Sequence, residues 1–381
     1  MILFLFFYVS IYGGVHVYAF MKLKKGLELG IASNLLLALL MLLMVAAPVV
    51  VHVLERSGQE AFARGLAYIS FIWMALIFIF ISAAFFFDIY RLIHFFARHL
   101  SQSPLGHLTL SIRSFCLLSI FLACAVVVYG YFEALNIRSD HLTITTDKLP
   151  PKIERLRIAQ ISDVHLGLIV GKSRLGRIVD KVRQARPDML VSTGDLVDGQ
   201  MDSPEKLADM LKNIPTPYGK YAITGNHEFY AGLERALAFT EKAGFIVLRG
   251  EGKTIKGIIN IAGVDDPARG PHRLEHAASE KAALEKLPRD LYTVLLKHQP
   301  VVNKASQGFF DLQLSGHTHK GQIFPFSLMT KLFYRMHTGL STLDDNTKLY
   351  VNRGSGTWGP PIRFLALPEV TIIDIEAATG K

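Results

Sequence analysis

The sequence predicts an α/β domain preceded by an all-α transmembrane bundle. Three observations lead to this fold class: long apolar stretches are confined to residues 1–135, strand and helix patterns alternate after them, and several predicted strands end in Asp, Asn or His. The chain of 381 residues is 50% hydrophobic and 19% charged, whereas an average soluble domain is about 25% charged. This apolar content excludes a disordered chain, and two Cys in so long a chain exclude a disulfide-stapled miniprotein.

The charged residues divide the chain into two parts of different character. Residues 1–150 hold 10 Lys and Arg and 7 Asp and Glu, whereas residues 151–381 hold 31 and 25. The formal net charge of +9 therefore splits into +3 and +6, without a dense basic tract. This balance suits an acidic substrate or a lipid surface, and we expect no nucleic-acid partner. The oligomeric state is left open.

Four apolar stretches are long enough to cross a bilayer, which takes about 20 residues. They cover about residues 2–21, 31–54, 66–87 and 114–132. The first lacks a positively charged start, which favours a retained anchor over a cleaved signal peptide. Residues 91–100 mix aromatic and basic side chains, as in an interfacial helix or a continuation of the third span. We expect a four-helix transmembrane domain over residues 1–135, a linker and first strand over 136–156, and a second domain over 157–381.

Basic residues beside the spans predict the orientation in the membrane. Loops rich in Lys and Arg stay in the cytoplasm. With four crossings, the second domain then lies on the extracytoplasmic face of the plasma or inner membrane. The basic residues in the loops after the first and third spans are Lys22, Lys24, Lys25, Arg91, Arg98 and Arg113. His16 and His52 in the first two spans are either proton-relay or metal-binding groups, or residues that lie near the interface or pack against a neighbouring helix. We favour the second alternative because no second ionisable residue lies nearby at helical spacing.

From residue 142 on, strand patterns alternate with helix patterns. The expected strands cover residues 142–146, 157–162, 189–193, 220–224, 245–248, 258–264, 292–296, 311–315, 348–352 and 369–375. The expected helices cover residues 175–185, 204–211 and 275–287, where apolar residues recur at helical spacing. This alternation predicts βαβ units in a mostly parallel arrangement, in which ligands gather at the carboxyl ends of strands.

Residues able to bind metals stand at the ends of five expected strands. They are Asp163, His165, Asp195, Asn226, His298, His317 and His319. Each alone has an ordinary explanation, such as a helix cap, a turn or a buried imidazole. Together they include Asp-x-His and His-x-His, in which two donors lie on the same side of an extended chain. Such donors suit Mn²⁺, Fe or Zn²⁺, and seven of them predict two metal sites about 3.5–4 Å apart.

Five motifs resemble, in order and spacing, those of the calcineurin-like metallophosphoesterases over about residues 140–381. They are Asp163-Val164-His165, Gly194-Asp195, Gly225-Asn226-His227-Glu228, His298 and Gly316-His317-Thr318-His319. The residues around them resemble a membrane-anchored, phosphodiesterase-like bacterial subgroup of that family. The resemblance implies a four-layer sandwich, with two mixed sheets flanked by helices, and a metal-dependent hydrolase of phosphoric esters.

The resemblance also implies a role for each matched residue. Asp163, His165 and His319 would hold one divalent metal ion. Asn226, His298 and His317 would hold a second, and Asp195 would bridge both. A hydroxide between the metals would attack the phosphorus atom, and His227 would act as a general acid or stabilise developing charge. We therefore expect Asp195, Asn226 and His227 to be catalytic. Hydrolases of UDP-sugar lipids carry Arg at the position of His227, which weakens the case for that substrate.

Two functions compete at this stage. One is a phosphodiester or pyrophosphate hydrolase that is anchored in the membrane and acts on a membrane-proximal or lipid-linked substrate. The other is an inactive domain that serves as a membrane-tethered scaffold or sensor. An inactive relative would lack some of the seven ligands, and all are present, so we favour the enzyme. Near the end of the chain, Arg353 and Arg363 are either a phosphate clamp or structural residues of a Gly-rich loop.

Overall fold

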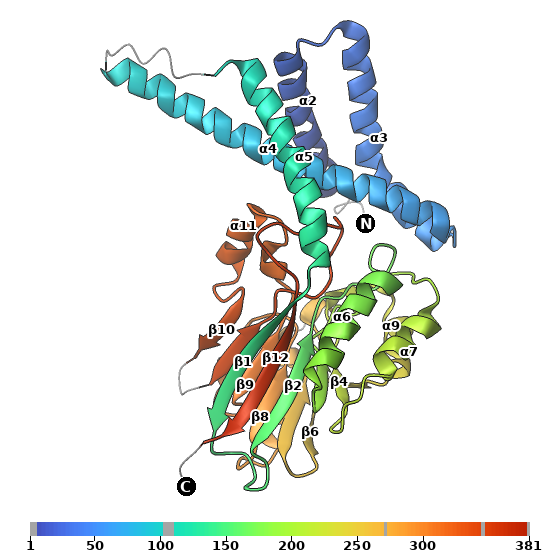
Figure 1. Cartoon of the computed structure of the whole chain (residues 1–381), viewed down its shortest axis with the longest axis vertical. Helices are drawn as coiled ribbons and strands as arrows, with labels where there is room; N and C mark the ends of the chain where they lie inside the picture. Colours follow the sequence, from blue (N-terminus) through green and yellow to red (C-terminus); the bar gives the residue numbers. More distant parts are fainter. Residues whose placement is uncertain (1–5, 102–109, 270–272, 344–346, 379–381) are drawn as a thin grey trace. The chain divides into compact units, whose positions relative to one another are not determined.

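The computed structural model describes residues 6–101, 110–269, 273–343 and 347–378, and the chain divides into two compact units (Figure 1). One unit comprises Met1–Phe132 with Gly359–Ile362, and the other comprises Glu133–Trp358 with Arg363–Lys381.

The first unit is helical. Its elements are the π-helical turn η1 (Val9–Gly13), α2 (Gly14–Leu27), α3 (Ile31–Arg56), α4 (Glu60–Ser101) and the start of α5 (Ile112–Leu135). Among the described residues, three helices are long and apolar enough to cross a membrane: Ile31–Arg56, Glu60–His99 and Ile112–Leu135. The first expected span, residues 2–21, falls partly on residues 1–5, which lie outside the described ones. Four crossings therefore stay a prediction.

Helix α4 is longer than the expected third span. It contains 42 residues in one continuous helix, or about 63 Å at 1.5 Å per residue. The hydrocarbon layer of a bilayer is only about 30 Å thick. Residues 91–100 therefore continue the third helix, and they do not form a separate interfacial helix.

His16 has a structural role in the helical unit. Its Nδ1 atom lies 2.8 Å from the carbonyl oxygen of Tyr12, and its Nε2 atom lies 2.9 Å from Nε1 of Trp73. A carbonyl only accepts and an indole N–H only donates, so Nδ1 carries the proton and Nε2 accepts. Both ring nitrogens are thus engaged between α2 and α4, and the structural alternative for His16 is confirmed.

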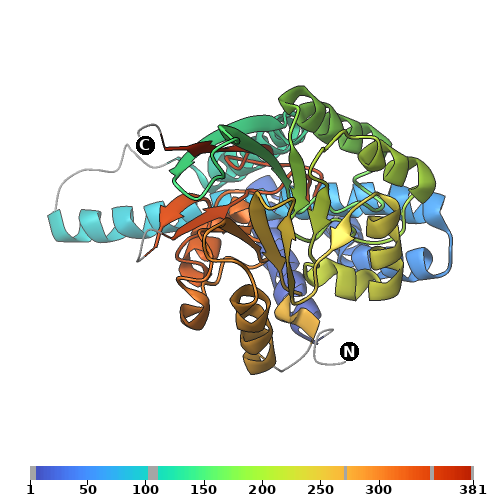
Figure 2. The same ribbon diagram turned by 90° about the horizontal axis from the view of Figure 1, so that it is seen from below.

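The second unit contains two mixed six-stranded sheets flanked by helices (Figure 2), so the predicted fold class is confirmed. The first sheet has the order β1-β12-β2-β3-β4-β5, with β12 antiparallel to β2 and the other neighbours parallel. Its strands are β1 (Arg138–Thr146), β12 (Glu369–Ala377), β2 (Arg155–Ile161), β3 (Met189–Ser192), β4 (Lys220–Ala222) and β5 (Ile246–Val247).

The second sheet has the order β10-β11-β9-β8-β7-β6, with parallel pairing from β11 to β7 and an antiparallel strand at each edge. Its strands are β10 (Gly339–Thr342), β11 (Lys348–Val351), β9 (Leu312–Ser315), β8 (Tyr292–Leu296), β7 (Ile259–Gly263) and β6 (Glu251–Ile255). The main core lies between the two sheets, where Ile158 and Val191 of one belong to the same buried cluster as Ile261 and Val294 of the other. Because helices cover the other faces, the central strands β3 and β8 are buried at every residue.

Helices connect the strands of this unit. The helices are α6 (Lys172–Ala185), α7 (Pro204–Lys212), α8 (Asn226–Ala231), α9 (Leu233–Lys242), α10 (Arg273–Glu285) and α11 (Phe326–Phe333), with 3₁₀ turns at η3 (Pro267–Arg269), η4 (Lys304–Ser306) and η5 (His319–Gly321). The ten expected strands and the three expected helices are present within a few residues of their predicted bounds. Strands β6 and β10 and helices α8, α9 and α11 were not expected from the sequence.

Candidate metal centre

The seven predicted metal ligands follow strands of both sheets. Asp163 and Asp195 come after β2 and β3 of the first sheet, and Asn226 begins α8 after β4. His298 and His317 come after β8 and β9 of the second sheet. Parallel strands bring their carboxyl ends to one edge of a sheet, so the packing of the two sheets brings these loops together.

Three of the predicted ligands form one group. The Nε2 atoms of His165 and His319 lie 3.0 Å apart, and Nε2 of His319 lies 3.4 Å from Oδ1 of Asp163. Asp163 is fully buried, and His165 is 2% exposed. Their ligand atoms all lie within 4.8 Å of one another, which is close enough to surround one ion.

The other four predicted ligands form a neighbouring group. Nε2 of His298 lies 3.2 Å from Oδ2 of Asp195, 3.2 Å from Nδ1 of His317 and 3.3 Å from Oδ1 of Asn226. The same Oδ2 atom of Asp195 lies 3.8 Å from Nε2 of His165, which belongs to the first group. Asp195 therefore lies between the two groups.

The hydrogen bonding of His298 is consistent with a ligand of a cation. Its Nδ1 atom lies 2.7 Å from the carbonyl oxygen of Thr193 and must donate to it. In a neutral ring, Nε2 then carries a lone pair, which faces oxygen atoms of Asp195 and Asn226. A metal-ligating histidine has this arrangement, with its second nitrogen donating to a carbonyl. The donors are nitrogen and oxygen atoms without a thiolate, which suits Mn²⁺, Fe or Zn²⁺.

The backbone at the cluster is strained. Five of the seven residues have positive φ, between 47° and 72°. Asp and His tolerate this region better than bulky residues, but each such residue still costs on the order of 1–3 kcal/mol. Strain of this kind is concentrated at functional sites. The five residues are Asp163, His165, Asp195, His317 and His319.

Two glycines in the motifs leave room for the ligands. A Cβ atom at Gly225 would overlap Oδ1 of Asp195, and one at Gly316 would overlap Oδ2 of Asp163. Any side chain at either position would displace a carboxylate of the cluster. Glycine before the ligand is therefore required by packing in both motifs.

The comparisons with known proteins agree with this geometry. The family model for calcineurin-like phosphoesterases matches residues 156–321. An uncharacterized metallophosphoesterase of Aquifex aeolicus is 38% identical over 257 residues, which cover 67% of this chain and 98% of the relative. The chain belongs to the calcineurin-like phosphoesterase family. It is a metal-dependent phosphoester hydrolase by family, and its substrate is a phosphate ester.

Two further relatives extend the similarity toward membrane proteins. A metallophosphoesterase of Helicobacter pylori is 35% identical over 268 residues, covering 69% of this chain and 71% of the relative. A zebrafish (Danio rerio) transmembrane protein with metallophosphoesterase domain is 30% identical over 314 residues, covering 79% of this chain and 72% of the relative. Together with the three long apolar helices, the transmembrane relative indicates that this phosphoesterase is a membrane protein.

Asp198 is a site residue of the phosphoesterase that the sequence analysis missed. Its Oδ1 atom lies 2.5 Å from Nδ1 of His227 and 3.7 Å from Nδ1 of His165. Burial lowers the pKa of His227, but the hydrogen bond to Asp198 and the charges of Asp195 and Asp198 together raise it to about 9. The two imidazoles hold the pKa of Asp198 well below its usual range, against the effect of its burial. One feature of the sequence could have indicated this role: Asp198 is a second Asp, three residues after Asp195 in the same loop.

Glu228 is a second residue of the site whose role the sequence did not reveal. It is 3% exposed, and its carboxylate accepts hydrogen bonds from four backbone N–H groups, at 2.7–3.1 Å. These groups belong to Gly225 at the start of α8 and to residues 195–197 after β3. Glu228 therefore holds together the two loops that carry Asp195 and Asn226.

The phosphate-clamp alternative is wrong for Arg363. Its guanidinium is fully buried, and all three of its nitrogens donate to backbone carbonyls, including those of Gly356 at 2.7 Å and Arg353 at 2.6 Å. Arg353 in turn forms ion pairs with Asp140 of β1 and Glu369 of β12. Of the two alternatives predicted from the sequence, both arginines therefore have the structural one.

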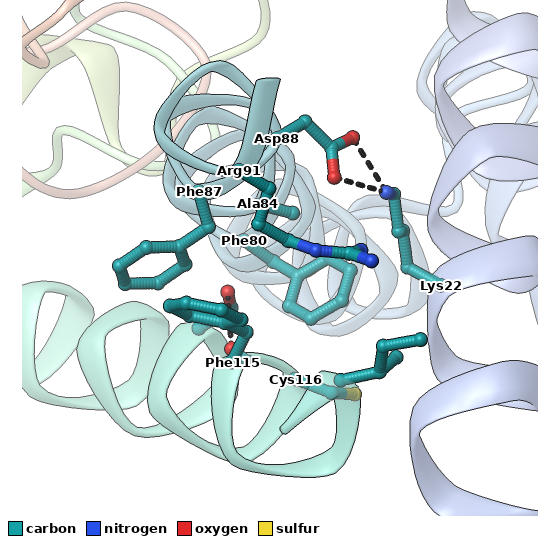
Figure 3. A pocket seen from close by; sticks show the side chains of 10 residues that line it. Lys22, Phe80, Ala84, Phe87, Asp88, Arg91, Phe115 and Cys116 are labelled. Carbon is teal, nitrogen blue, oxygen red and sulfur yellow. Dashed lines mark hydrogen bonds and ion pairs between the residues drawn. The ribbon is translucent and has the colours of Figure 1, made fainter. Parts of the chain in front are cut away.

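A separate group of charged residues lies in the helical unit (Figure 3). Nζ of Lys22 lies 2.6 and 2.5 Å from the two carboxylate oxygens of Asp88, and the hydroxyl of Tyr18 donates to the same carboxylate at 2.8 Å. Arg91 points into the same pocket, beside the ring of Phe80 (Figure 3). The ion pair connects α2 to α4, and the group lacks the His and Asp ligand pattern of the phosphoesterase site.

Proposed function

We propose that the protein is a membrane-anchored, dinuclear-metal phosphoesterase that hydrolyses phosphodiester or pyrophosphate bonds. The observation that supports two metal ions is the position of Asp195, whose Oδ2 atom lies 3.2 Å from Nε2 of His298 and 3.8 Å from Nε2 of His165. In this proposal, Asp163, His165 and His319 hold one ion. Asn226, His298 and His317 hold the other, and Asp195 is shared.

Bound divalent ions, Mn, Fe or Zn, would neutralise the phosphate oxygens and lower the pKa of the attacking water. The protein supplies the proton for the leaving oxygen through His227. Because Nδ1 of His227 is engaged by Asp198, Nε2 is the nitrogen available to the substrate. The ring of Trp358 lies 5.6 Å from that of His227, and the ring of Tyr230 lies 5.5 Å away. Two aromatic side chains thus flank the ring of His227.

The proposed substrate is a membrane-proximal or lipid-linked phosphate ester. Within the described residues, the same chain carries three helices of membrane-spanning length and apolarity. A domain attached to them samples the headgroup layer at high effective concentration. The net charge of +6 on residues 151–381 also favours an acidic substrate.

A hydrolysis screen with the detergent-solubilised full chain tests the proposal. The protein is treated with a chelator and then supplied separately with Mn²⁺, Fe²⁺ or Zn²⁺. The substrates are an aryl phosphodiester, an aryl phosphomonoester, a UDP-sugar lipid and a polyprenyl pyrophosphate. We expect turnover of a diester or pyrophosphate that disappears with the chelator and returns with a metal. Bound metal without turnover of any of the four substrates would favour the scaffold or sensor instead.

We further propose that the α/β unit lies on the extracytoplasmic face of the membrane. The basic residues after the first and third predicted spans support this orientation through the positive-inside rule. A reporter that is active only outside the cytoplasm, fused after Lys381, should be active. A silent reporter, together with protection from protease in sealed cells, would place the catalytic domain in the cytoplasm.

A further inference from the structure

Helix α11 carries an exposed apolar surface on the α/β unit. We define the α11 surface by its five large apolar side chains, which are 47–80% exposed. The most exposed are Leu332 at 80% and Phe333 at 77%. An apolar patch of this kind on a folded domain marks an interaction site. The five residues are Phe326, Leu328, Met329, Leu332 and Phe333.

The helix has its polar and apolar sides reversed relative to a helix of a soluble domain. At 3.6 residues per turn, the five apolar side chains fall within an arc of about 160°. The opposite side contains Ser327 and Thr330, and Thr330 is the buried residue of the helix. The backbone of Ser327 lies so close to Gly321 that a Cβ atom at position 321 would overlap the backbone of Ser327. A helix that covers a core turns its apolar side inward. Helix α11 instead turns its apolar side toward the surface.

The α11 surface is directly connected to the candidate metal centre. Helix α11 begins five residues after η5, the turn that starts with His319. At the other end of the helix, the ring of Tyr334 lies 5.4 Å from the ring of His317. The hydroxyl of Thr318, between the two histidines, donates to the carbonyl oxygen of His337 at 2.6 Å. A partner bound to the α11 surface therefore lies beside the loop that carries His317 and His319.

The charged residues in the sequence around α11 are all positive. Lys320, Lys331 and Arg335 stand within or beside the helix, and residues 312–343 contain no Asp or Glu. Lys331 and Arg335 are exposed. An apolar helix face bordered by basic side chains is complementary to an anionic lipid surface, where the apolar side chains enter the acyl boundary and the basic ones meet the phosphates.

We propose that the α11 surface inserts into a bilayer containing anionic lipids and holds the metal centre at the level of the lipid headgroups. The same chain contains helices that are long and apolar enough to cross a membrane, which supports a bilayer as the partner of this surface. Insertion of such a face reaches about 5–10 Å into the boundary between headgroups and acyl chains. The consequence for lipid-linked substrates rests on the proposed function, whereas insertion itself does not depend on catalysis.

Depth-dependent quenching tests insertion without reference to activity. Cys116 and Cys124, the two native cysteines, are replaced by Ser in the full chain, and an environment-sensitive NBD fluorophore is attached to Leu332→Cys. The protein is reconstituted into phosphatidylcholine vesicles with and without phosphatidylglycerol. Lipids spin-labelled near the top of the acyl chain should quench the emission by about twofold or more, and more strongly with phosphatidylglycerol. The matched control is Ile246→Cys in β5, 43% exposed, which should not be quenched.

Two outcomes would overturn the insertion. Equal quenching at residues 332 and 246 would show that the label samples the bilayer without specific docking. A label at residue 332 that is shielded from water but not quenched by lipid would show that protein covers the surface. If that shielding grows with the protein-to-lipid ratio, the cover is a second copy. If it does not, the cover is the helical unit of the same chain.

A paired rate measurement tests the consequence for the substrate. The double variant Leu332→Glu/Phe333→Glu and the control Ile246→Glu are compared on a soluble aryl phosphodiester and on a lipid-linked phosphodiester in vesicles. We expect the ratio of lipid to soluble rates to fall about tenfold or more in the double variant and to stay unchanged in the control. An unchanged ratio in the double variant would overturn the role of α11 in substrate access. If the unmodified chain hydrolyses neither compound, the proposed function fails while quenching still decides the insertion.

Discussion

The Nδ1 atom of His227 lies 2.5 Å from Oδ1 of Asp198. A carboxylate stabilises the protonated imidazole and fixes which ring nitrogen it engages. Asp198 thus acts through His227 as a positioning residue, and His227 is the group that would contact the substrate. This pair makes the pH dependence of the reaction a direct test of the site.

The rate with an alkyl phosphodiester should fall as the pH rises through the pKa of His227, which is raised to about 9. A general acid must be protonated, so its contribution is present below this pKa and is lost above it. Asp198→Asn removes a negative charge that raises the pKa, so the fall should move to lower pH. The measurement is kcat/KM against pH for both proteins. If the alkaline fall of kcat/KM occurs at the same pH in Asp198→Asn as in the unmodified protein, Asp198 does not control the proton on His227.

His227→Ala should retain its metal content and lose rate. General acid–base catalysis contributes about 10²–10⁴-fold, and the loss should be of that order with an alkyl leaving group. With an aryl leaving group, which departs without a proton, the loss should be much smaller. Equal losses with the two leaving groups would assign His227 a role other than proton donation.

Asp195→Asn should lose bound metal and turnover together. The carboxylate lies between the two ligand groups, so in the proposed dinuclear site its charge would act on both ions. Metal analysis by mass spectrometry and the rate on an aryl phosphodiester are measured on the same sample. The matched control is Asp209→Asn, an exposed residue of α7, which should change neither. Two metals per chain at a normal rate in Asp195→Asn would remove the bridging role.

Arg363→Met should lower the free energy of unfolding by about 3 kcal/mol or more. The substitution leaves several buried carbonyls without their donor, and each unsatisfied buried group costs on the order of 1–3 kcal/mol. The control is Arg289→Lys, an exposed arginine, for which we expect a change within about 0.5 kcal/mol. Urea unfolding in detergent, followed by tryptophan fluorescence, gives both values. Normal stability of Arg363→Met would contradict the structural role of the buried guanidinium.

The sequence predicted the parts of the site that depend on strand ends. Asp163, Asp195 and His298 follow buried apolar runs, and such runs are recognisable because they alternate with helical patterns and turns. The carboxyl ends of parallel strands then meet by topology alone. The candidate ligands could therefore be predicted from the sequence alone, while their assignment to particular metal ions stays a prediction.

The missed features depend on contacts between distant loops. Glu228 accepts hydrogen bonds from the loop after β3, about 30 residues earlier in the chain, and a sequence pattern does not show which backbone groups a carboxylate will meet. Arg353 looked free to bind phosphate because its partners, Asp140 and Glu369, come from two other strands. Helix α11 was overlooked because it has only eight residues, too few for a periodic pattern.

The pairing of β1 with β12 has a consequence for the order in which the protein folds. In the first sheet, β1 is an edge strand whose hydrogen-bonded neighbour is β12, and their register joins Arg138 to Glu369. Contacts so far apart in sequence form late and slowly. During synthesis, β1 leaves the ribosome long before β12, so β1 is first exposed without its partner strand. The first sheet of the α/β unit therefore cannot be completed before β12 has been synthesised, and a nascent chain arrested before residue 369 should remain sensitive to protease along β1.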